Sequence, residues 1–303
     1  MSGQLSIPTL DEVKQTIETY LSTVKENSYV EVAFFGGSFT GLDIQTQKEY
    51  LNVVQPYIKE GKVNSIRLST RPDYISQEIL DNLKAYNVQD IELGAQSLDD
   101  QVLSFVERGH SFKDVENASK MINSYGFSLG LQMMIGLPLD TIEKSIKTAN
   151  KIVELKAKTT RIYPTLVIEN TPLATLFREK KYIPLSIDEA VVWTKEIYKI
   201  FIENNITILR VGLHPSKDIL SGKGFIAGPF HVSFREKVIT ALWRDKFKSL
   251  TTNTSKIIVN PKDINYVIGY NSDNKHFIES INPKIIFVQD NKIPINTFQL
   301  IQQ

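Results

Sequence analysis

A nearly unbroken apolar run, Val30 to Leu42 (VEVAFFGGSFTGL), most constrains what this chain can fold into. A run that is apolar on both sides is typical of a parallel strand covered on both faces, and Gly36, Gly37 and Ser38 mark its exit from the sheet. Paired glycines let backbone N–H groups turn toward a ligand, because glycine has no Cβ and adopts positive φ. Taken alone, this segment is also consistent with an ordinary strand-to-helix turn, since its glycines lack the spacing of a dinucleotide-binding motif.

Strand and helix patterns alternate along the chain up to residue 213. Helices are expected over 43–58, 76–83, 99–106, 111–124, 141–155 and 186–203, and strands over 65–70, 90–97, 127–135, 160–168 and 206–213. This order predicts repeated right-handed βαβ units, and hence an α/β fold with a parallel sheet or barrel.

A further helix is expected before the first strand, and the pattern changes near the other end. Thr9 and Glu12 form a capping box. One helical face then carries Leu10, Val13, Ile17, Tyr20, Leu21 and Val24. From residue 222 a glycine-rich loop leads into a helix and then into short strands and helices. We therefore expect a partial α/β barrel over 1–221 and a small C-terminal α+β extension over 222–303.

The composition excludes several classes of protein and site. No apolar run approaches the roughly 20 residues that span a bilayer, and the first residues lack a signal pattern, so a cytoplasmic protein without membrane contact is expected. The formal charge of +1 gives no overall attraction to polyanions, although a local basic surface could hold RNA. With no cysteine and four scattered histidines, no disulfide, thiolate site or metal site is expected in this chain.

Five of the predicted strands present polar side chains on one face. Because successive strand residues point to opposite faces, each strand divides into an apolar and a polar register. The polar registers contain Arg67, Ser69, Glu92, Gly94, Gln96, Ser128, Gly130, Gln132, Arg161, Tyr163, Thr165 and Arg210. Small closed barrels are filled by Val, Ile and Leu, so this pattern favours a wide-mouthed partial barrel around a polar ligand. The alternatives are a self-satisfying network, in which Glu92 and Glu169 neutralise the arginines, or a register that exposes these residues to solvent.

Five segments resemble the radical S-adenosylmethionine (SAM) superfamily, most closely the branch of the Elongator catalytic subunit and its bacterial relatives. They are FFGGSFTGL (34–42), LSTRPDYI (68–75), ELGAQSLDDQVLSFVERGHS (92–111), GLQMMIGLP (130–138) and GLHPSKDILSGKGFIAGPFHVSFRE (212–236). The resemblance implies a partial barrel of six strands and six helices, open on one side. It also implies SAM as cofactor and, in an intact parent, a 4Fe–4S cluster.

The resemblance assigns the methionine part of the cofactor and its ribose to three places. The backbone at Gly36, Gly37 and Ser38 matches the segment that holds the methionine amino group. Gln96 matches a residue that contacts the ribose, and Arg108 matches the arginine that pairs with the methionine carboxylate. A planar guanidinium suits that role because it can form two parallel hydrogen bonds to a carboxylate.

The resemblance assigns the adenosine end to the last strands of the sheet. Met134 and Gly136, with Thr165 and Val167, match backbone that frames the adenine. Gln132 lies where some relatives carry an acidic ribose ligand, so that contact is expected to be weaker or differently made.

The absence of cysteine is the largest departure from the family pattern. Family members carry three cysteines on the loop after a first barrel strand, and these ligate the cluster. This chain has none, and its first residues resemble the segment that comes after that loop, so the first strand and the cluster loop are expected to be missing. Without thiolates and an electron donor, SAM is not cleaved to a radical, so this chain is not expected to perform radical chemistry.

Residues after the barrel offer a second region of interest. His231 and Arg235 lie near where RNA or substrate would enter in relatives, although a capped surface turn explains them equally well. The densest basic region comprises Lys223, Arg235, Lys237, Arg244, Lys246 and Lys248. It is either a solvated face or a surface for tRNA. His110 is expected to support helix packing or a hydrogen bond.

Three hypotheses remain. The first is a radical SAM core of the Elongator-like branch whose intact parent modifies tRNA or another substrate. The second is a cluster-free descendant that binds a nucleoside or RNA without catalysis. The third is an unrelated barrel hydrolase that uses Glu92 as its acid or base.

Overall fold

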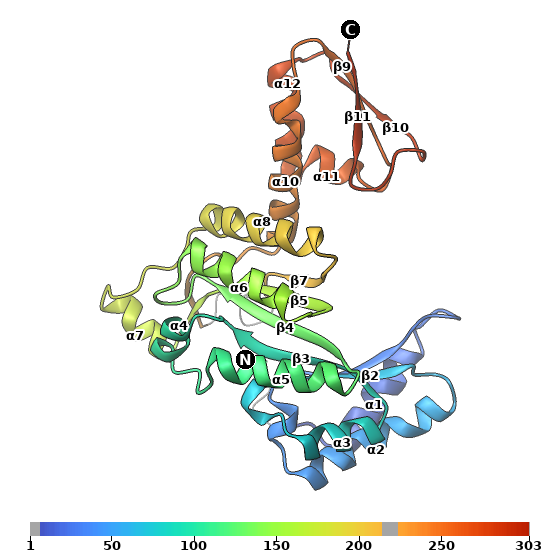
Figure 1. Ribbon diagram of the computed structural model, residues 1–303. Coiled ribbons are helices and arrows are strands. Elements are labelled where there is room, and N and C mark those ends of the chain that lie inside the picture. Colours follow the sequence, from blue (N-terminus) through green and yellow to red (C-terminus); the bar gives the residue numbers. More distant parts are fainter. Residues whose placement is uncertain (1–6, 214–223, 303) are drawn as a thin grey trace.

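The computed structural model describes residues 7–213 and 224–302 and contains a parallel half-barrel with a smaller unit at one end (Figure 1). The six strands are β1 (Glu31–Phe34), β2 (Ser65–Thr70), β3 (Val88–Gln96), β4 (Ser128–Ile135), β5 (Thr159–Pro164) and β7 (Thr207–Val211). They pair in the order β1-β2-β3-β4-β5-β7, and every pairing is parallel. The predicted α/β half-barrel is therefore confirmed.

Helices cover the convex face of this sheet. They are α1 (Leu10–Leu21), α2 (Ile44–Lys59), α3 (Gln77–Ala85), α4 (Asp100–Phe105), α5 (Phe112–Ser124), α6 (Ile142–Glu154) and α8 (Ile187–Glu203). The predicted capping box at Thr9 is present, and Ser111 forms one with Asp114. Side chains of Asp43, Ser76, Thr141 and Ser186 also accept hydrogen bonds from first-turn N–H groups. None of the described helices is long and apolar enough to cross a membrane.

The apolar register of the strands forms the main core. Its side chains point toward the helices and are fully buried, for example Ile66, Leu68, Ile91, Leu93, Leu129 and Leu131. Burial of this face leaves the polar register on the concave face, as the alternation predicts. Short 3₁₀ turns occur at Phe39–Gly41, Pro72–Tyr74, Phe247–Ser249 and Tyr270–Ser272.

The apolar face predicted for the first helix is only partly buried. Ile17 is buried, and Val13 and Leu21 pack beside it, which gives a stripe at i, i+4 and i+8 against α2. Tyr20 and Val24 were expected on the same buried face, but they are 70% and 39% exposed. The reason is that α1 packs mainly on a single helix, and α1 ends before Val24.

The predicted strand over 160–168 is divided in two. Pro164 ends β5 because it has no N–H for the ladder, and the chain then forms β6 (Val167–Ile168). β6 pairs antiparallel with β8 (Phe225–Ala227). A helix that the sequence did not predict, α7 (Pro172–Arg178), follows β6; it is too short to show a helical period, although Thr171 caps it.

The C-terminal unit has its own core, which confirms the predicted α+β extension. It comprises α10 (Phe234–Lys246), β9 (Thr254–Val259), α11 (Ile264–Ile268), α12 (Asp273–Ile281), β10 (Ile286–Gln289) and β11 (Phe298–Gln302). The strands form a mixed sheet in the order β10-β9-β11. Val238 of α10 belongs to the main core and Trp243 to the second, so α10 joins both. The boundary predicted after residue 221 falls outside the described residues.

Candidate cofactor-binding site

Glu92 is the centre of the concave face. Its side chain is buried, and Arg161 donates to both of its oxygens, from Nε to Oε2 at 2.6 Å and from Nη2 to Oε1 at 3.0 Å. Arg67 Nη1 reaches Oε1 at 3.3 Å, and Gln132 Nε2 donates to Oε2 at 3.2 Å. Gly130 leaves room for this carboxylate, because a Cβ there would lie 2.7 Å from Glu92 Cγ. Both oxygens of Glu92 are thus engaged by the protein itself.

Arg67 extends this network across the neighbouring strands. Its Nη2 pairs with Glu31 at 3.2 Å and with Asp90 at 3.1 Å, in addition to its contact with Glu92. Three carboxylates therefore surround Arg67, and the arginines that face them need no other counter-ion. We call Glu31, Arg67, Asp90, Glu92, Gln132 and Arg161 the charged layer.

The charged layer corresponds to the self-satisfying network that the sequence left open, with one difference. Glu92 does neutralise the arginines of the barrel, but Glu169 lies outside it and pairs with Arg178 of α7. Arg210 donates from Nε to the backbone oxygen of Gly212 at 3.1 Å. No ligand is needed to satisfy Glu92, whose double guanidinium contact also suits a structural carboxylate better than a hydrolytic acid or base.

Arg108 has a different environment. Its Nε is buried without a hydrogen-bond partner in the described part of the chain, and no carboxylate there forms an ion pair with it. Asp73 instead binds Arg71, whose Nε and Nη2 donate to it at 2.9 Å and 2.7 Å. Burial, together with repulsion from Arg71, lowers the pKa of the Arg108 guanidinium. A partly buried cation without an ion-pair partner favours an anion from outside the chain.

Gln96 and Arg108 approach one another over Gly94. A Cβ at Gly94 would lie 2.8 Å from Gln96 Nε2 and 4.0 Å from Arg108 Nη2, so both side chains end beside this glycine. Gln96 ends β3 with φ of +63°, a left-handed conformation that is unusual for a residue other than glycine. The structure thus brings together two of the residues that the sequence assigned to the cofactor.

His110, two residues after Arg108, contacts the backbone of β3. Its Nε2 lies 3.2 Å from the backbone oxygen of Ala95, the residue before Gln96, and its ring is buried. Burial lowers the pKa of His110, so the ring is neutral at neutral pH and donates through Nε2–H. This is the hydrogen bond that was expected of His110.

The glycine turn after β1 is open. Gly36 adopts φ of +107°, and a Cβ at Gly37 would meet no atom within 4 Å. Ser69 of β2 donates to the Gly37 oxygen at 3.5 Å, which places this turn beside the strand that carries Arg67. The Arg161 guanidinium of the charged layer lies 4.8 Å from the ring centre of Phe35.

The turn after β4 is held by two side chains that sequence patterns did not single out. Asp140 Oδ2 accepts the N–H of Gly136 at 2.9 Å, and Tyr182 Oη donates to the Gly136 oxygen at 2.6 Å. Burial raises the pKa of Asp140 to about 6 and also raises that of Tyr182. Asp140 follows Gly136 closely and could have been noticed as a turn residue, whereas nothing in the sequence links Tyr182 to this turn.

The remaining residues assigned to the nucleoside lie along the same edge. Met134 pairs with Tyr163 in the register of β4 and β5. Thr165 donates from Oγ1 to the Ile135 oxygen at 2.8 Å. Val167 is fully buried and pairs with Ala227 of β8, so neither its side chain nor its backbone is exposed in this structure.

His231 and Arg235 lie apart from the charged layer, at the start of α10. His231 Nδ1 accepts the N–H of Ser233 at 2.9 Å, and Arg235 Nη1 donates to Tyr266 Oη at 3.4 Å. Three further cations of the basic region lie over aromatic rings: Lys237 over Tyr270, Arg244 over Phe277 and Lys246 over Trp243. Most of this region therefore stabilises the C-terminal unit. Lys223 lies outside the described residues.

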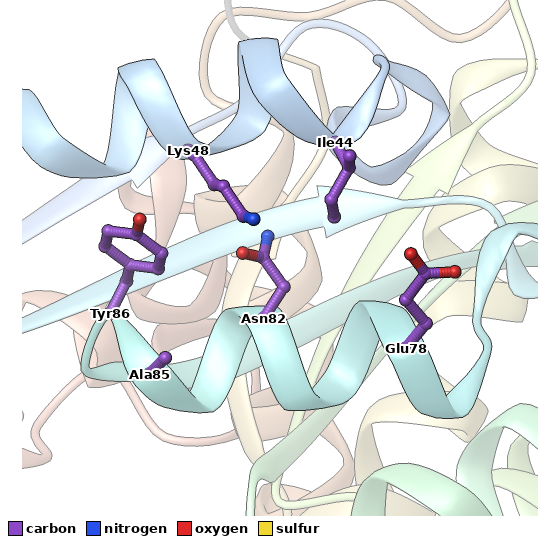
Figure 2. A pocket seen from close by; sticks show the side chains of 6 residues that line it. All are labelled: Ile44, Lys48, Glu78, Asn82, Ala85 and Tyr86. Carbon is purple, nitrogen blue, oxygen red and sulfur yellow. The ribbon is translucent and has the colours of Figure 1, made fainter.

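A groove of about 580 Å³ lies between α2 and α3, on the helical layer (Figure 2). It is lined by Ile44, Lys48, Glu78, Asn82, Ala85 and Tyr86. None of the residues assigned from the sequence faces it.

No group of three or more His, Cys, Asp or Glu in the described part of the chain is arranged to hold a metal ion. The full sequence contains no cysteine. These residues do not fit a 4Fe–4S cluster, which thiolates hold.

The parallel half-barrel of six strands defines the class of fold. Residues 2–152 match the Radical SAM superfamily, and residues 157–244 match the Radical_SAM C-terminal domain. The chain belongs to the radical SAM superfamily.

Its relatives include Elongator-type proteins. It is 26% identical over 200 residues to a tRNA uridine(34) acetyltransferase of Methanocaldococcus jannaschii, covering 59% of this chain and 37% of that protein. It is 28% identical over 208 residues to Elongator complex protein 3 of Schizosaccharomyces pombe, covering 63% and 38%. The structure of Methanocaldococcus infernus Elp3 with an N-terminal deletion matches with a TM-score of 0.66 and 20% identity, covering 86% of this chain and 62% of that one. This chain thus spans well under half the length of these two curated relatives.

Replacing Glu92 with Gln tests the charged layer. We expect Glu92→Gln to reduce the free energy of unfolding by about 2–4 kcal/mol, because Arg67 and Arg161 lose their shared buried counter-ion. Urea unfolding measures this change. Glu169→Gln is the control; its partner Arg178 is about half exposed, so a loss of less than roughly 1 kcal/mol is expected. Equal losses in both variants would contradict this role of Glu92.

Replacing Asp140 with Asn tests the carboxylate at the Gly136 turn. The folded-state pKa of about 6 lies above the usual 3.8, so the folded protein binds this proton more tightly than the unfolded chain does. As pH falls from 7 to 4, this group should therefore add about 2 kcal/mol to the stability of the wild type relative to Asp140→Asn. Urea unfolding of both proteins across this range measures the difference. A constant difference would show that Asp140 has an ordinary pKa.

Proposed function

We propose that this chain binds SAM, or a closely related adenosyl amino acid, at the carboxyl ends of its half-barrel strands. The observation that carries this proposal is Arg108, whose guanidinium is partly buried and has no carboxylate partner in the described part of the chain. A chain that keeps a cation in this state gains stability when an anion binds it. The carboxylate of the amino-acid moiety is such an anion.

The neighbours of Arg108 suit the rest of that moiety. Gln96 lies next to it over Gly94 and offers an amide to a ribose hydroxyl. The space beside Gly37 is open, and the carbonyl oxygens of this turn are acceptors that a ligand ammonium requires. The family likeness supports the same placement.

The nucleoside would then lie along the ends of β4 and β5. There Met134 and Gly136 supply backbone, and Thr165 and Val167 follow after Pro164. The amide of Gln132 already donates to Glu92, so we do not assign it to the ribose.

The radical step is not part of this proposal. Radical SAM proteins use a 4Fe–4S cluster with SAM, but these 303 residues contain no thiolate to ligate one. We propose that the chain binds the adenosyl ligand without cleaving it. Any cluster used with this site must have ligands from outside these residues.

Calorimetric titration with S-adenosylhomocysteine, which shares the carboxylate and the nucleoside, tests the site. We expect binding by the wild type, and a weakening by roughly 1–3 kcal/mol in Arg108→Ala, the scale of a lost charge-assisted hydrogen bond. Arg178→Ala removes an arginine whose side chain is 54% exposed and should leave the affinity unchanged. Absence of binding by the wild type, or equal affinity in Arg108→Ala, would contradict the proposal.

For the biological context we propose tRNA modification. This rests on relatives named tRNA uridine(34) acetyltransferase. Acetyl transfer itself is not proposed, because this chain covers only 37% of the first of these relatives.

A filter-binding assay tests the association with RNA. We expect a tRNA transcript to be retained more strongly than a DNA hairpin of the same anticodon-stem sequence, since discrimination requires contacts beyond phosphate charge. Equal retention would show that any association is non-specific.

A further inference from the structure

The turn at Gly136 brings together parts of the chain that are far apart in sequence. Gly136 comes directly after β4, where φ is +71°. Its N–H donates to Asp140, in the loop before α6, and its backbone oxygen accepts from Tyr182, which lies beyond α7 in the chain. Both backbone polar groups of one residue are thus fixed by side chains from two different loops.

Asp140 is itself held in place. Ser145 Oγ donates to its Oδ2 at 2.8 Å, and the N–H of Thr141 donates to its Oδ1 at 2.9 Å. Lys144 and Tyr182 are the charged and titratable groups that act on it. With these bonds the carboxylate has little freedom to move away from Gly136.

The loop that carries Tyr182 also packs directly on the turn. A Cβ at Gly136 would lie 2.8 Å from Leu185 Cδ1, so the close approach requires glycine at this position. Tyr182 is 7% exposed, and its ring packs with Val167 and Ala174 in a small core of its own. Packing of the ring therefore holds the Tyr182 hydroxyl in position beside Gly136.

The turn lies on the same edge as the Arg108 site. Met133 of β4 pairs with Gln96 of β3, so Gly136 is three residues farther along its strand. At about 3.3 Å per residue, this separates Gly136 from the row of Gln96 by roughly 10 Å. Gly136 therefore lies beyond the row of Gln96, the residue that we place at the ribose, and at the strand ends where we propose the nucleoside.

We propose that Asp140 and Tyr182 are positioning residues that fix the Gly136 backbone so that the end of β4 receives the base of the adenosyl ligand. This rests on the proposed function. Neither side chain needs to touch the ligand. They hold the backbone in its binding conformation beforehand, so that binding does not have to order the turn.

Binding of two different ligands distinguishes the role of Asp140 and Tyr182 from that of Arg108. S-adenosylhomocysteine carries both the carboxylate and the nucleoside, whereas methylthioadenosine lacks the amino-acid part. Affinities are measured on the full chain, by direct titration with the first ligand and by displacement of it with the second. The variants are Tyr182→Phe, Asp140→Asn and Arg108→Ala, and the control is Tyr20→Phe, whose side chain is 70% exposed.

We expect Tyr182→Phe to weaken both ligands by the same factor of roughly three to ten, the range for a lost uncharged hydrogen bond. Arg108→Ala should weaken only S-adenosylhomocysteine. In the double variant the two effects should multiply, because Arg108 and Tyr182 act on different parts of the ligand and no hydrogen bond or ion pair of the described residues joins them. Tyr20→Phe should change neither affinity. If Tyr182→Phe does not fold, as judged by circular dichroism, Asp140→Asn supplies the same comparison.

Four results would overturn the inference. The first is unchanged affinity for S-adenosylhomocysteine in Tyr182→Phe and Asp140→Asn, and the second is a loss of affinity in these variants for S-adenosylhomocysteine but not for methylthioadenosine. The third is that methylthioadenosine does not compete with S-adenosylhomocysteine for the wild type. The fourth is that the two losses of affinity do not multiply in the double variant. Failure of the wild type to bind S-adenosylhomocysteine is a different outcome, because it removes the proposed function itself.

Discussion

The concave face of this protein holds partly buried arginines of two kinds, which differ in whether the chain itself supplies a counter-ion. A guanidinium taken out of water needs a counter-ion or a full set of acceptors, or it destabilises the fold. Arg67 and Arg161 meet this requirement inside the chain through Glu92, whereas the one acid close to Arg108 in the described residues, Asp73, is bound to Arg71. The concave face therefore has a closed charged layer at mid-strand and an open cationic position at the strand ends.

Because the charged layer satisfies its own charges, polar residues on the concave face do not by themselves show where a ligand binds. The charged layer links five neighbouring strands, since its members come from β1, β2, β3, β4 and β5, and Glu92 lies against Gly130. The proposed ligand site lies above it, where strands give way to turns. Carboxyl ends of parallel strands commonly carry the functional groups of α/β folds, because loops there can vary without disturbing the sheet.

Much of the fold could be predicted from local signals. Helix starts such as Thr9 and Ser111 carry their caps within three residues, and the two strand registers result directly from the alternation of residue types. The predictions that failed depended on neighbours distant in sequence. The sequence pattern predicts Tyr20 as a core residue, but α1 packs mainly on α2 and leaves it exposed. Tyr182 has no local sequence feature that links it to a turn 46 residues earlier.

The same limit applies to the site. The assignment of Gln96 and Arg108 came from family resemblance, and the structure adds a physical reason for it, namely a buried donor without an acceptor in the described residues. A crystal structure of the protein with S-adenosylhomocysteine tests this most directly. We expect the ligand carboxylate within hydrogen-bonding distance of the Arg108 guanidinium and the base against the end of β4. Density for the ligand elsewhere, or Arg108 paired with a protein carboxylate, would contradict the central claim.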